Sequence, residues 1–130
     1  MLLKTFTDKT VVETAAALQK AIEANHIGVM QIHNIKETMA KKGVEFDREC
    51  LIYEVCQPEQ ASKVLELDMT VSTALPCRIS LYHEAGKSVL AALKPTMLLA
   101  MFDTPQLQLV AQEIEEMMIK IMEEAAACPK

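Results

Sequence analysis

Residues 49–58 read ECLIYEVCQP and contain the clearest strand signal in the chain. Side chains alternate between the two faces of a strand, so positions 50, 52, 54 and 56 share one face and the apolar positions 51, 53 and 55 share the other. Pro58 then suits the first position of a helix, because its missing N–H needs no partner there. The stretch therefore predicts a strand over residues 49–56 that leads directly into a helix, with apolar positions at Ala61, Val64 and Leu65.

Signals on both sides extend this pattern over the whole chain. Thr10 and Glu13 have the spacing of a capping box at a helix start, and Gly86 lies in the turn of a predicted hairpin. We expect one α+β domain over residues 1–130, with two layers, a mostly antiparallel sheet, helices on one face and a long C-terminal helix. Further strands are predicted at residues 2–7, 27–33, 77–83 and 88–93, and further helices at residues 10–25, 34–43, 95–102 and from 104 onward.

The predicted last helix begins at Thr104-Pro105, a capping residue followed by proline. A broad apolar stripe along this helix is typical of a side that packs on a core, whereas Leu109 and Ile119 lie off the stripe. A second apolar side indicates a surface for a partner, and we expect a homodimer. The stripe consists of Leu107, Val110, Ala111, Ile114, Met117, Met118 and Ile121.

Composition excludes several function classes. Eighteen acidic residues against thirteen basic ones give a net charge of −5, which disfavours nucleic acids as partners because phosphate binding needs a basic face. The three glycines are isolated, so the glycine-rich loops that bind nucleotides are absent. No apolar stretch is long enough to cross a bilayer, and residues 1–8 lack the features of a secretory signal. We therefore expect a cytoplasmic protein without a membrane partner.

Cys56 is the first candidate functional residue. It ends the predicted strand just before the helix that starts at Pro58, near backbone N–H groups that have no partner within the helix. The dipole of a helix favours negative charge at its N-terminus and lowers the pKa of a thiol there. The competing interpretation is a small buried residue, because free cysteines are among the most buried residue types.

Cys77 follows Leu75-Pro76 and opens the next predicted strand. If that strand pairs antiparallel with residues 49–56, the end of one lies beside the start of the other and the two thiols come close. In a reducing cytoplasm a permanent disulfide is not expected, so such a pair would be catalytic, redox-sensing or metal-binding. Cys50 lies about 20 Å from Cys56 along the strand, and Cys128 lies near the C-terminus; both are left out of the site.

A metal site and a carboxylate site have less support in the sequence. The three histidines are scattered, and no Cys-x-x-Cys or His-x-x-x-His spacing is present. Glu54 lies on the predicted strand face of Cys56, where a partly buried carboxylate can accept a proton. The alternative is that Glu54 lies on an exposed face of the sheet.

Several short motifs lie along the chain: Gly43-Val44-Glu45-Phe46, the run from Tyr53 to Pro58, Ala61, Leu65, Leu75-Pro76-Cys77 and Lys94-Pro95. Together they resemble the motifs of a prokaryotic family known as domain of unknown function 302. The resemblance implies a compact α+β fold, commonly dimeric, with cysteines at the positions of Cys56 and Cys77. Family members usually have asparagine at the position of Gln57, and asparagine is the better helix cap.

These observations lead to one main hypothesis and two alternatives. The main hypothesis is a cytoplasmic thiol domain in which Cys56 reacts and Cys77 is its partner in redox exchange or sulfur handling, with a small molecule or a protein thiol as the other reactant. The first alternative is a non-catalytic binding or assembly module, and the second is haem or metal binding. The sequence identifies no cofactor. The residues expected to shape the site are Glu54, Gln57, Pro58 and Pro76.

Overall fold

The computed structural model describes residues 1–127. These residues form five strands, five α-helices and one 3₁₀ helix. The strands are β1 (Leu2–Thr7), β2 (Gly28–Asn34), β3 (Cys50–Cys56), β4 (Cys77–Glu84) and β5 (Lys87–Leu93). The helices are α1 (Val11–Ala24), α2 (Ile35–Lys41), α3 (Pro58–Leu67), the 3₁₀ helix η1 (Met69–Ala74), α4 (Pro95–Leu99) and α5 (Leu107–Ala126).

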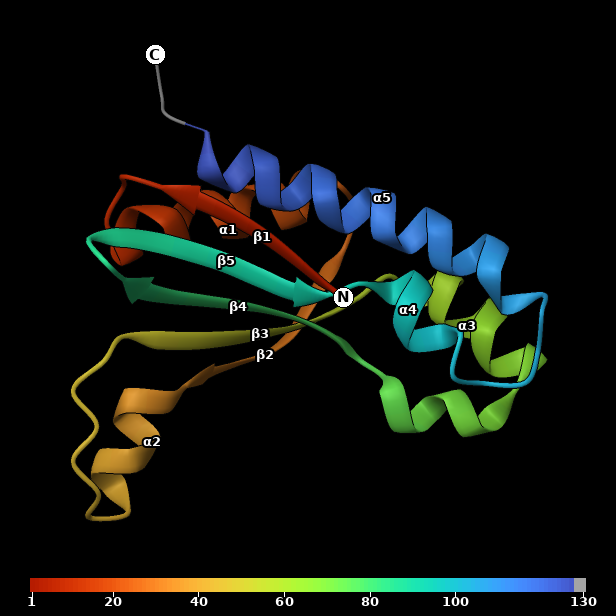
Figure 1. Cartoon of the computed structure of the whole chain (residues 1–130), viewed down its shortest axis with the longest axis horizontal. Coiled ribbons are helices and arrows are strands. Elements are labelled where there is room, and N and C mark those ends of the chain that lie inside the picture. Colours follow the sequence, from red (N-terminus) through yellow and green to blue (C-terminus); the bar gives the residue numbers. More distant parts are fainter. Residues whose placement is uncertain (128–130) are drawn as a thin grey trace.

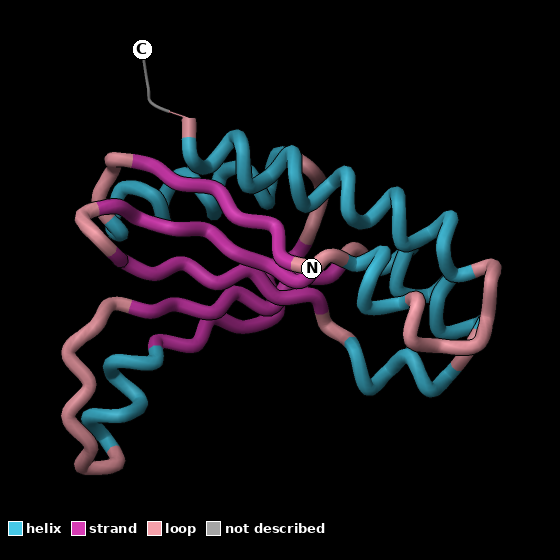
Figure 2. Tube along the Cα trace, viewed as in Figure 1, coloured by secondary structure: helices cyan, strands magenta, loops and turns pink. Residues whose placement is uncertain are grey.

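The five strands form one sheet in the order β1-β5-β4-β3-β2, and every neighbouring pair is antiparallel. Figure 2 shows the strands side by side, and in Figure 1 helices α1 and α5 lie together along one side of this sheet. The predicted α+β architecture, with helices on one face and a long C-terminal helix, is confirmed.

The main core lies between the sheet and helices α1 and α5. Strands β3, β4 and β5 direct alternate residues into it, as a half-buried sheet requires. A second buried cluster joins α3, η1, α4 and the first half of α5 at one end of the sheet. The main core includes Leu18, Ile22, Tyr53, Val55, Ile79, Leu81, Leu90 and Ile121, and the second cluster includes Val64, Val71, Leu99, Leu107 and Ala111.

Local chemistry explains where several elements start and turn. The hydroxyl of Thr10 accepts a hydrogen bond from the Glu13 backbone N–H, and the Glu13 carboxylate accepts one from the Thr10 N–H, which completes the predicted capping box. The hairpin between β4 and β5 turns through Ala85 and Gly86, both with positive φ, as the tight hairpin turns that match the twist of a sheet require.

Three local features differ from the sequence prediction. The 3₁₀ helix Met69–Ala74 was not predicted, and α4 ends at Leu99 rather than at residue 102. Helix α5 begins at Leu107, not at residue 104, and has no side-chain cap. The physical reason is that the Thr104 hydroxyl donates to Asp68 Oδ2 at 3.3 Å instead of capping the helix.

The two ends of the sheet differ in how they are covered. Helix α2 projects from one end, while α3, η1 and α4 gather at the other, where β3 ends and β4 begins (Figure 1). On α5, Leu109 is 68% exposed whereas Ile119 is half-buried, and a homodimer formed through this helix stays a prediction. No helix within residues 1–127 combines the length and apolar character needed to span a membrane.

Candidate functional site

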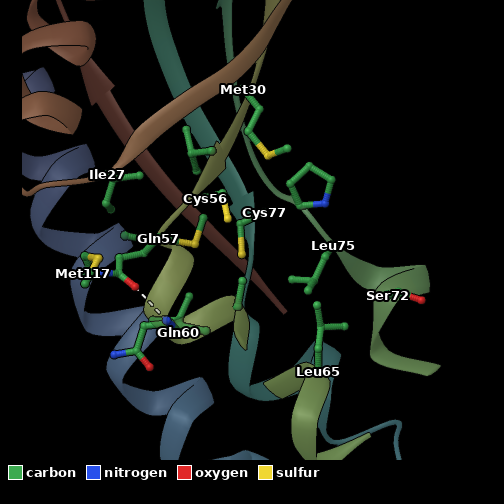
Figure 3. A pocket seen from close by; sticks show the side chains of 15 residues that line it. Ile27, Met30, Cys56, Gln57, Gln60, Leu65, Ser72, Leu75, Cys77 and Met117 are labelled. Atoms are coloured by element: carbon green, nitrogen blue, oxygen red, sulfur yellow. Dashed lines mark hydrogen bonds between the residues drawn. The ribbon is translucent and has the colours of Figure 1, made fainter. Parts of the chain in front are cut away.

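A cavity of about 270 Å³ lies where the end of β3 and the start of β4 meet α3, η1 and α5. Figure 3 shows Cys56 and Cys77 near the centre of this cavity, with Met30 and Met117 on different sides of them. We call it the sulfur pocket. Its lining consists of Ile27, Met30, Val55, Cys56, Gln57, Gln60, Ala61, Leu65, Ser72, Leu75, Pro76, Cys77, Ile114, Met117 and Met118.

The pairing of β3 with β4 brings the two thiols together. Val55 is the direct partner of Cys77 in the antiparallel register, so Cys56 is offset from Cys77 by one residue. Such an offset places the two Cα atoms about 6 Å apart, a separation that a disulfide can span. Both cysteines are free thiols here. The prediction that the end of one strand lies beside the start of the next is confirmed.

The environment of Cys77 keeps its thiol protonated at neutral pH. Burial raises the pKa of Cys77 to about 11, and the neighbouring Cys56 adds to the rise. Burial has this effect because a thiolate loses the solvation that stabilises its charge. Cys77 also lines a second cavity, of about 240 Å³, that extends toward α4. Cys77 therefore belongs to the wall between two cavities, and it does not have the low pKa of a reactive thiol.

The polar groups of the pocket come from α3 and η1. The Gln57 side chain accepts a hydrogen bond from the Gln60 backbone N–H at 2.7 Å and thereby caps α3. The Gln60 amide donates to Glu113 at 2.9 Å, while Gln60 Oε1 is buried and has no hydrogen-bond partner within residues 1–127. Ser72 supplies the remaining polar side chain. All three groups are uncharged, so the pocket offers only neutral hydrogen-bonding groups.

Glu54 lies outside the sulfur pocket. Its carboxylate is 3.3 Å from Arg78 and 3.5 Å from His33 Nε2, and its side chain is only 15% exposed. The two residues that follow it along β3 line the cavity, but Glu54 does not. Glu54 therefore does not line the sulfur pocket with Cys56, and its predicted part in the site stays a prediction. Glu54 lies two residues before Cys56 along β3, where its carboxylate contacts Arg78 and His33.

Of the other residues considered from the sequence, some line the pocket and others do not. Pro76 lines the sulfur pocket, whereas Pro58 occupies the first turn of α3 and does not reach the lining. Cys50 lies at the opposite end of β3, as the sequence indicated. Cys128 lies outside the described residues. The structure thus brings together Cys56, Gln57, Pro76 and Cys77.

Several lining residues were not predicted as part of the site, among them three methionines, Met30, Met117 and Met118. Met30 comes from an irregular point in β2, where the register with β3 shifts between Val29 and Gln31. Met117 was assigned only to the apolar stripe of the last helix, and it is this stripe that extends into the pocket. The one available signal was the high methionine content, nine residues in the chain, because methionine is common at adaptable binding surfaces.

A conventional metal centre is absent from the part of the chain that the structure describes. No three side chains among its His, Cys, Asp and Glu residues lie close enough together to hold an ion. Structural zinc sites use four such ligands. Within residues 1–127, Cys56 and Cys77 therefore have no third His, Cys, Asp or Glu side chain beside them to build a zinc site.

Comparison with known proteins supports the family resemblance. The chain is similar to a solved structure described as an uncharacterized conserved protein DUF302 from Bacillus stearothermophilus, with 28% sequence identity and a TM-score of 0.90. The similarity covers 95% of this chain and 97% of that one. No curated protein matches. The family model described as "Domain of unknown function DUF302" matches residues 3–125, and this chain therefore belongs to the DUF302 family.

Proposed function

We propose that this protein is a non-catalytic binding module and that its ligand occupies the sulfur pocket. One observation carries the proposal: the cavity is lined by apolar and neutral side chains, and among residues 1–127 its only ionisable groups are the thiols of Cys56 and Cys77. A small site of this kind binds by excluding water from apolar surface and by a few well-placed polar groups. The three polar side chains are Gln57, Gln60 and Ser72.

The size of the pocket supports a compact ligand. Its volume of about 270 Å³ lies just below the range of roughly 300–1,000 Å³ that is usual for small-molecule sites. Most of the lining belongs to β3, α3 and α5, which also contribute to the two buried clusters. A pocket whose walls are held by packed elements is largely preformed, so binding costs little reorganisation.

A thiol-exchange function is the second candidate. The observation in its favour is the offset pairing of Cys56 with Cys77 on adjacent strands, which suits a reversible disulfide. It has less support because the pocket lining contains no His, Asp, Glu, Lys or Arg to act as a base or to stabilise a thiolate. The protonated Cys77 would also be a slow nucleophile at neutral pH.

The binding proposal can be tested with phenylnaphthylamine, a neutral fluorescent probe that brightens in apolar surroundings. Ala61 lies on α3 and lines the pocket, so we expect Ala61→Phe to fill the cavity and weaken probe binding at least about tenfold, equivalent to about 1.4 kcal/mol. Ala40→Phe is the matched control, because Ala40 is an exposed residue of α2. Equal probe binding by both variants would exclude the pocket as the binding site.

The two candidates also differ in what they require of the thiols. A variant with both Cys56→Ala and Cys77→Ala keeps the apolar walls of the pocket, so a binding module should retain the probe. A thiol-exchange protein would lose all activity toward a small disulfide. Mass spectrometry of the wild-type protein after exposure to oxidised glutathione would report an internal disulfide, as a loss of two hydrogen atoms, if exchange occurs.

A further inference from the structure

Sulfur is concentrated in the pocket to an unusual degree. Five of its fifteen lining residues are cysteine or methionine: Met30, Cys56, Cys77, Met117 and Met118. They come from β2, β3, β4 and α5, so the sheet and the last helix each contribute donors from well-separated parts of the sequence. The lining contains no imidazole and no carboxylate. A donor set of thiols and thioethers without nitrogen or carboxylate ligands selects soft metal ions.

We propose that the sulfur pocket binds a single Cu(I) ion, held between Cys56 and Cys77 with Met30 as a third donor at the entrance. This inference rests on the proposed binding function and names its ligand class. Thiolate and thioether ligands are those that favour Cu(I), and an ion of this kind accepts two or three ligands where zinc needs four. The absence of any three-residue metal cluster of His, Cys, Asp and Glu within residues 1–127 agrees with this preference.

The position of Met30 supports its role as a donor at the entrance. Met30 is the residue left without a partner where the pairing of β2 with β3 shifts register. A bulge of this kind redirects a side chain away from the regular alternation of the strand. Met30 is 63% exposed and still lines the pocket, and in Figure 3 it lies above Cys56 and Cys77. An exposed thioether beside two inner thiols is suited to receive an ion and pass it inward.

The binding reaction involves exchange of protons and no electron transfer. Two copper–thiolate bonds form as the two S–H bonds of Cys56 and Cys77 break, and both protons leave to solvent. The uncharged thioether of Met30 adds a third copper–sulfur bond without releasing a proton, and the copper stays in the Cu(I) state. The Cu(I) ion together with its two thiolate ligands carries one net negative charge. Helix α3 has ten residues, and its N-terminal residue Pro58 lies two positions after Cys56. The positive end of the helix dipole therefore faces the new charge and offsets part of its burial.

The test uses the full chain, reduced and kept free of oxygen, with Cu(I) supplied in the presence of bicinchoninate, a coloured Cu(I) chelator. We expect the protein to withdraw one Cu(I) per chain from the chelator. Cys56→Ser and Cys77→Ser should each weaken Cu(I) binding by about 100-fold or more. Removing a residue that only hydrogen-bonds to a metal ligand already lowers metal affinity by up to about 100-fold, and these two cysteines are ligands themselves. Met30→Leu should weaken it by about tenfold. Cys50→Ser is the matched control, because Cys50 is a free thiol outside the pocket.

Two outcomes would overturn the inference. One is a wild-type protein that takes no Cu(I) from the chelator, and the other is a variant with both Cys56→Ser and Cys77→Ser that binds as tightly as the wild type. If Cys77→Ser fails to fold by circular dichroism, Cys56→Ser decides the question alone, because Cys56 is partly exposed at the end of β3. A thousandfold excess of Zn(II) that displaces the Cu(I) would also contradict the sulfur-only site.

Failure of the copper inference and failure of the proposed function give different results. A protein that binds phenylnaphthylamine, and loses it in Ala61→Phe, but takes no Cu(I) has a binding pocket for a different ligand. A protein that binds neither probe nor Cu(I) contradicts both proposals. The copper inference is supported when Cu(I) and the probe compete for the same pocket and Ala61→Phe weakens the binding of both.

Discussion

Glu54 and Cys56 are two residues apart on β3, yet they end in opposite chemical environments. Glu54 lies beside the Arg78 guanidinium at 3.3 Å and the His33 imidazole at 3.5 Å. Cys56 lies in a pocket whose lining contains no charged side chain. The end of β3 thus separates a charged cluster (Glu54, His33 and Arg78) from the sulfur pocket. Because the charges pair with one another outside the pocket, its interior stays neutral and suits an apolar or soft ligand.

The largest effect is expected when a carboxylate is placed inside the neutral pocket. Cys77→Asp puts an acidic group at a half-buried position that has no cationic partner in the lining. Such a charge loses its hydration without compensation, so we expect the free energy of unfolding to fall by about 3–5 kcal/mol. Urea denaturation followed by circular dichroism measures the change.

Ser80→Asp provides the control for that substitution. Ser80 lies on β4 opposite Ile52, on the face of the sheet that carries Arg78 and Glu54. A carboxylate there stays near solvent and near Arg78, so we expect a change within about 0.5 kcal/mol. A similar loss of unfolding free energy in both variants would mean that a carboxylate destabilises the protein no more in the pocket than on the open face of the sheet.

High pH tests the same point without a substitution at Cys77, because it deprotonates the thiol and so places a negative charge in the pocket. The folded state raises the pKa of this thiol to about 11, so the folded protein holds the proton more tightly than the unfolded chain, whose cysteines titrate near 8.5. The resulting stabilisation is complete below about pH 8.5 and is lost as the pH rises toward 11. Its size is about 2–3 kcal/mol.

Cys77→Ala isolates this contribution. The variant lacks the thiol, so its free energy of unfolding should fall less between pH 8 and pH 11 than that of the wild type, by about 2 kcal/mol. Burial also raises the pKa of Tyr53, but that residue is present in both proteins and its effect cancels. Parallel pH profiles for the two proteins would show that the burial of Cys77 has no energetic consequence.

The charged cluster should contribute less than the pocket. Glu54→Gln removes the carboxylate that contacts both Arg78 and His33, whose side chains are 64% and 36% exposed. Ion pairs with exposed partners contribute about 0–1 kcal/mol, so we expect a loss of about 1 kcal/mol or less. The loss should shrink at high salt, because salt screens exposed charges. A loss that does not depend on salt would indicate packing rather than charge.

The sequence predicted the fold well wherever a pattern repeats. Alternation in residues 49–56 and the capping box at Thr10 and Glu13 are local rules, and the structure follows both. The antiparallel pairing of β3 with β4, which sets Val55 opposite Cys77, was assumed when the two thiols were predicted to lie close together, and the structure has this pairing. The separation of Glu54 from Cys56 was not predicted, because it depends on the contacts of Glu54 with Arg78 and His33, which come from two other strands.

Features that arise from contacts distant in sequence were missed. The bulge at Met30 depends on how β2 meets β3, and the late start of α5 depends on a hydrogen bond between Thr104 and Asp68, 36 residues apart. Neither leaves a periodic signal in the sequence. For the same reason the sequence located the two thiols of the pocket but not the thioethers of Met30, Met117 and Met118.

The smallest expected effect concerns Gln57, which lies between the thiol and α3. Asparagine caps helices better than glutamine as a rule, but here the Gln57 side chain already accepts the Gln60 N–H at 2.7 Å. Gln57→Asn should therefore change the free energy of unfolding by no more than about 0.5 kcal/mol, while Gln57→Ala removes the cap and costs about 1 kcal/mol. Thermal denaturation of the wild type and the two variants measures the order of their stabilities. A large gain in Gln57→Asn would show that the longer side chain caps poorly, and that the start of α3 beside Cys56 is less firmly held than the hydrogen bond implies.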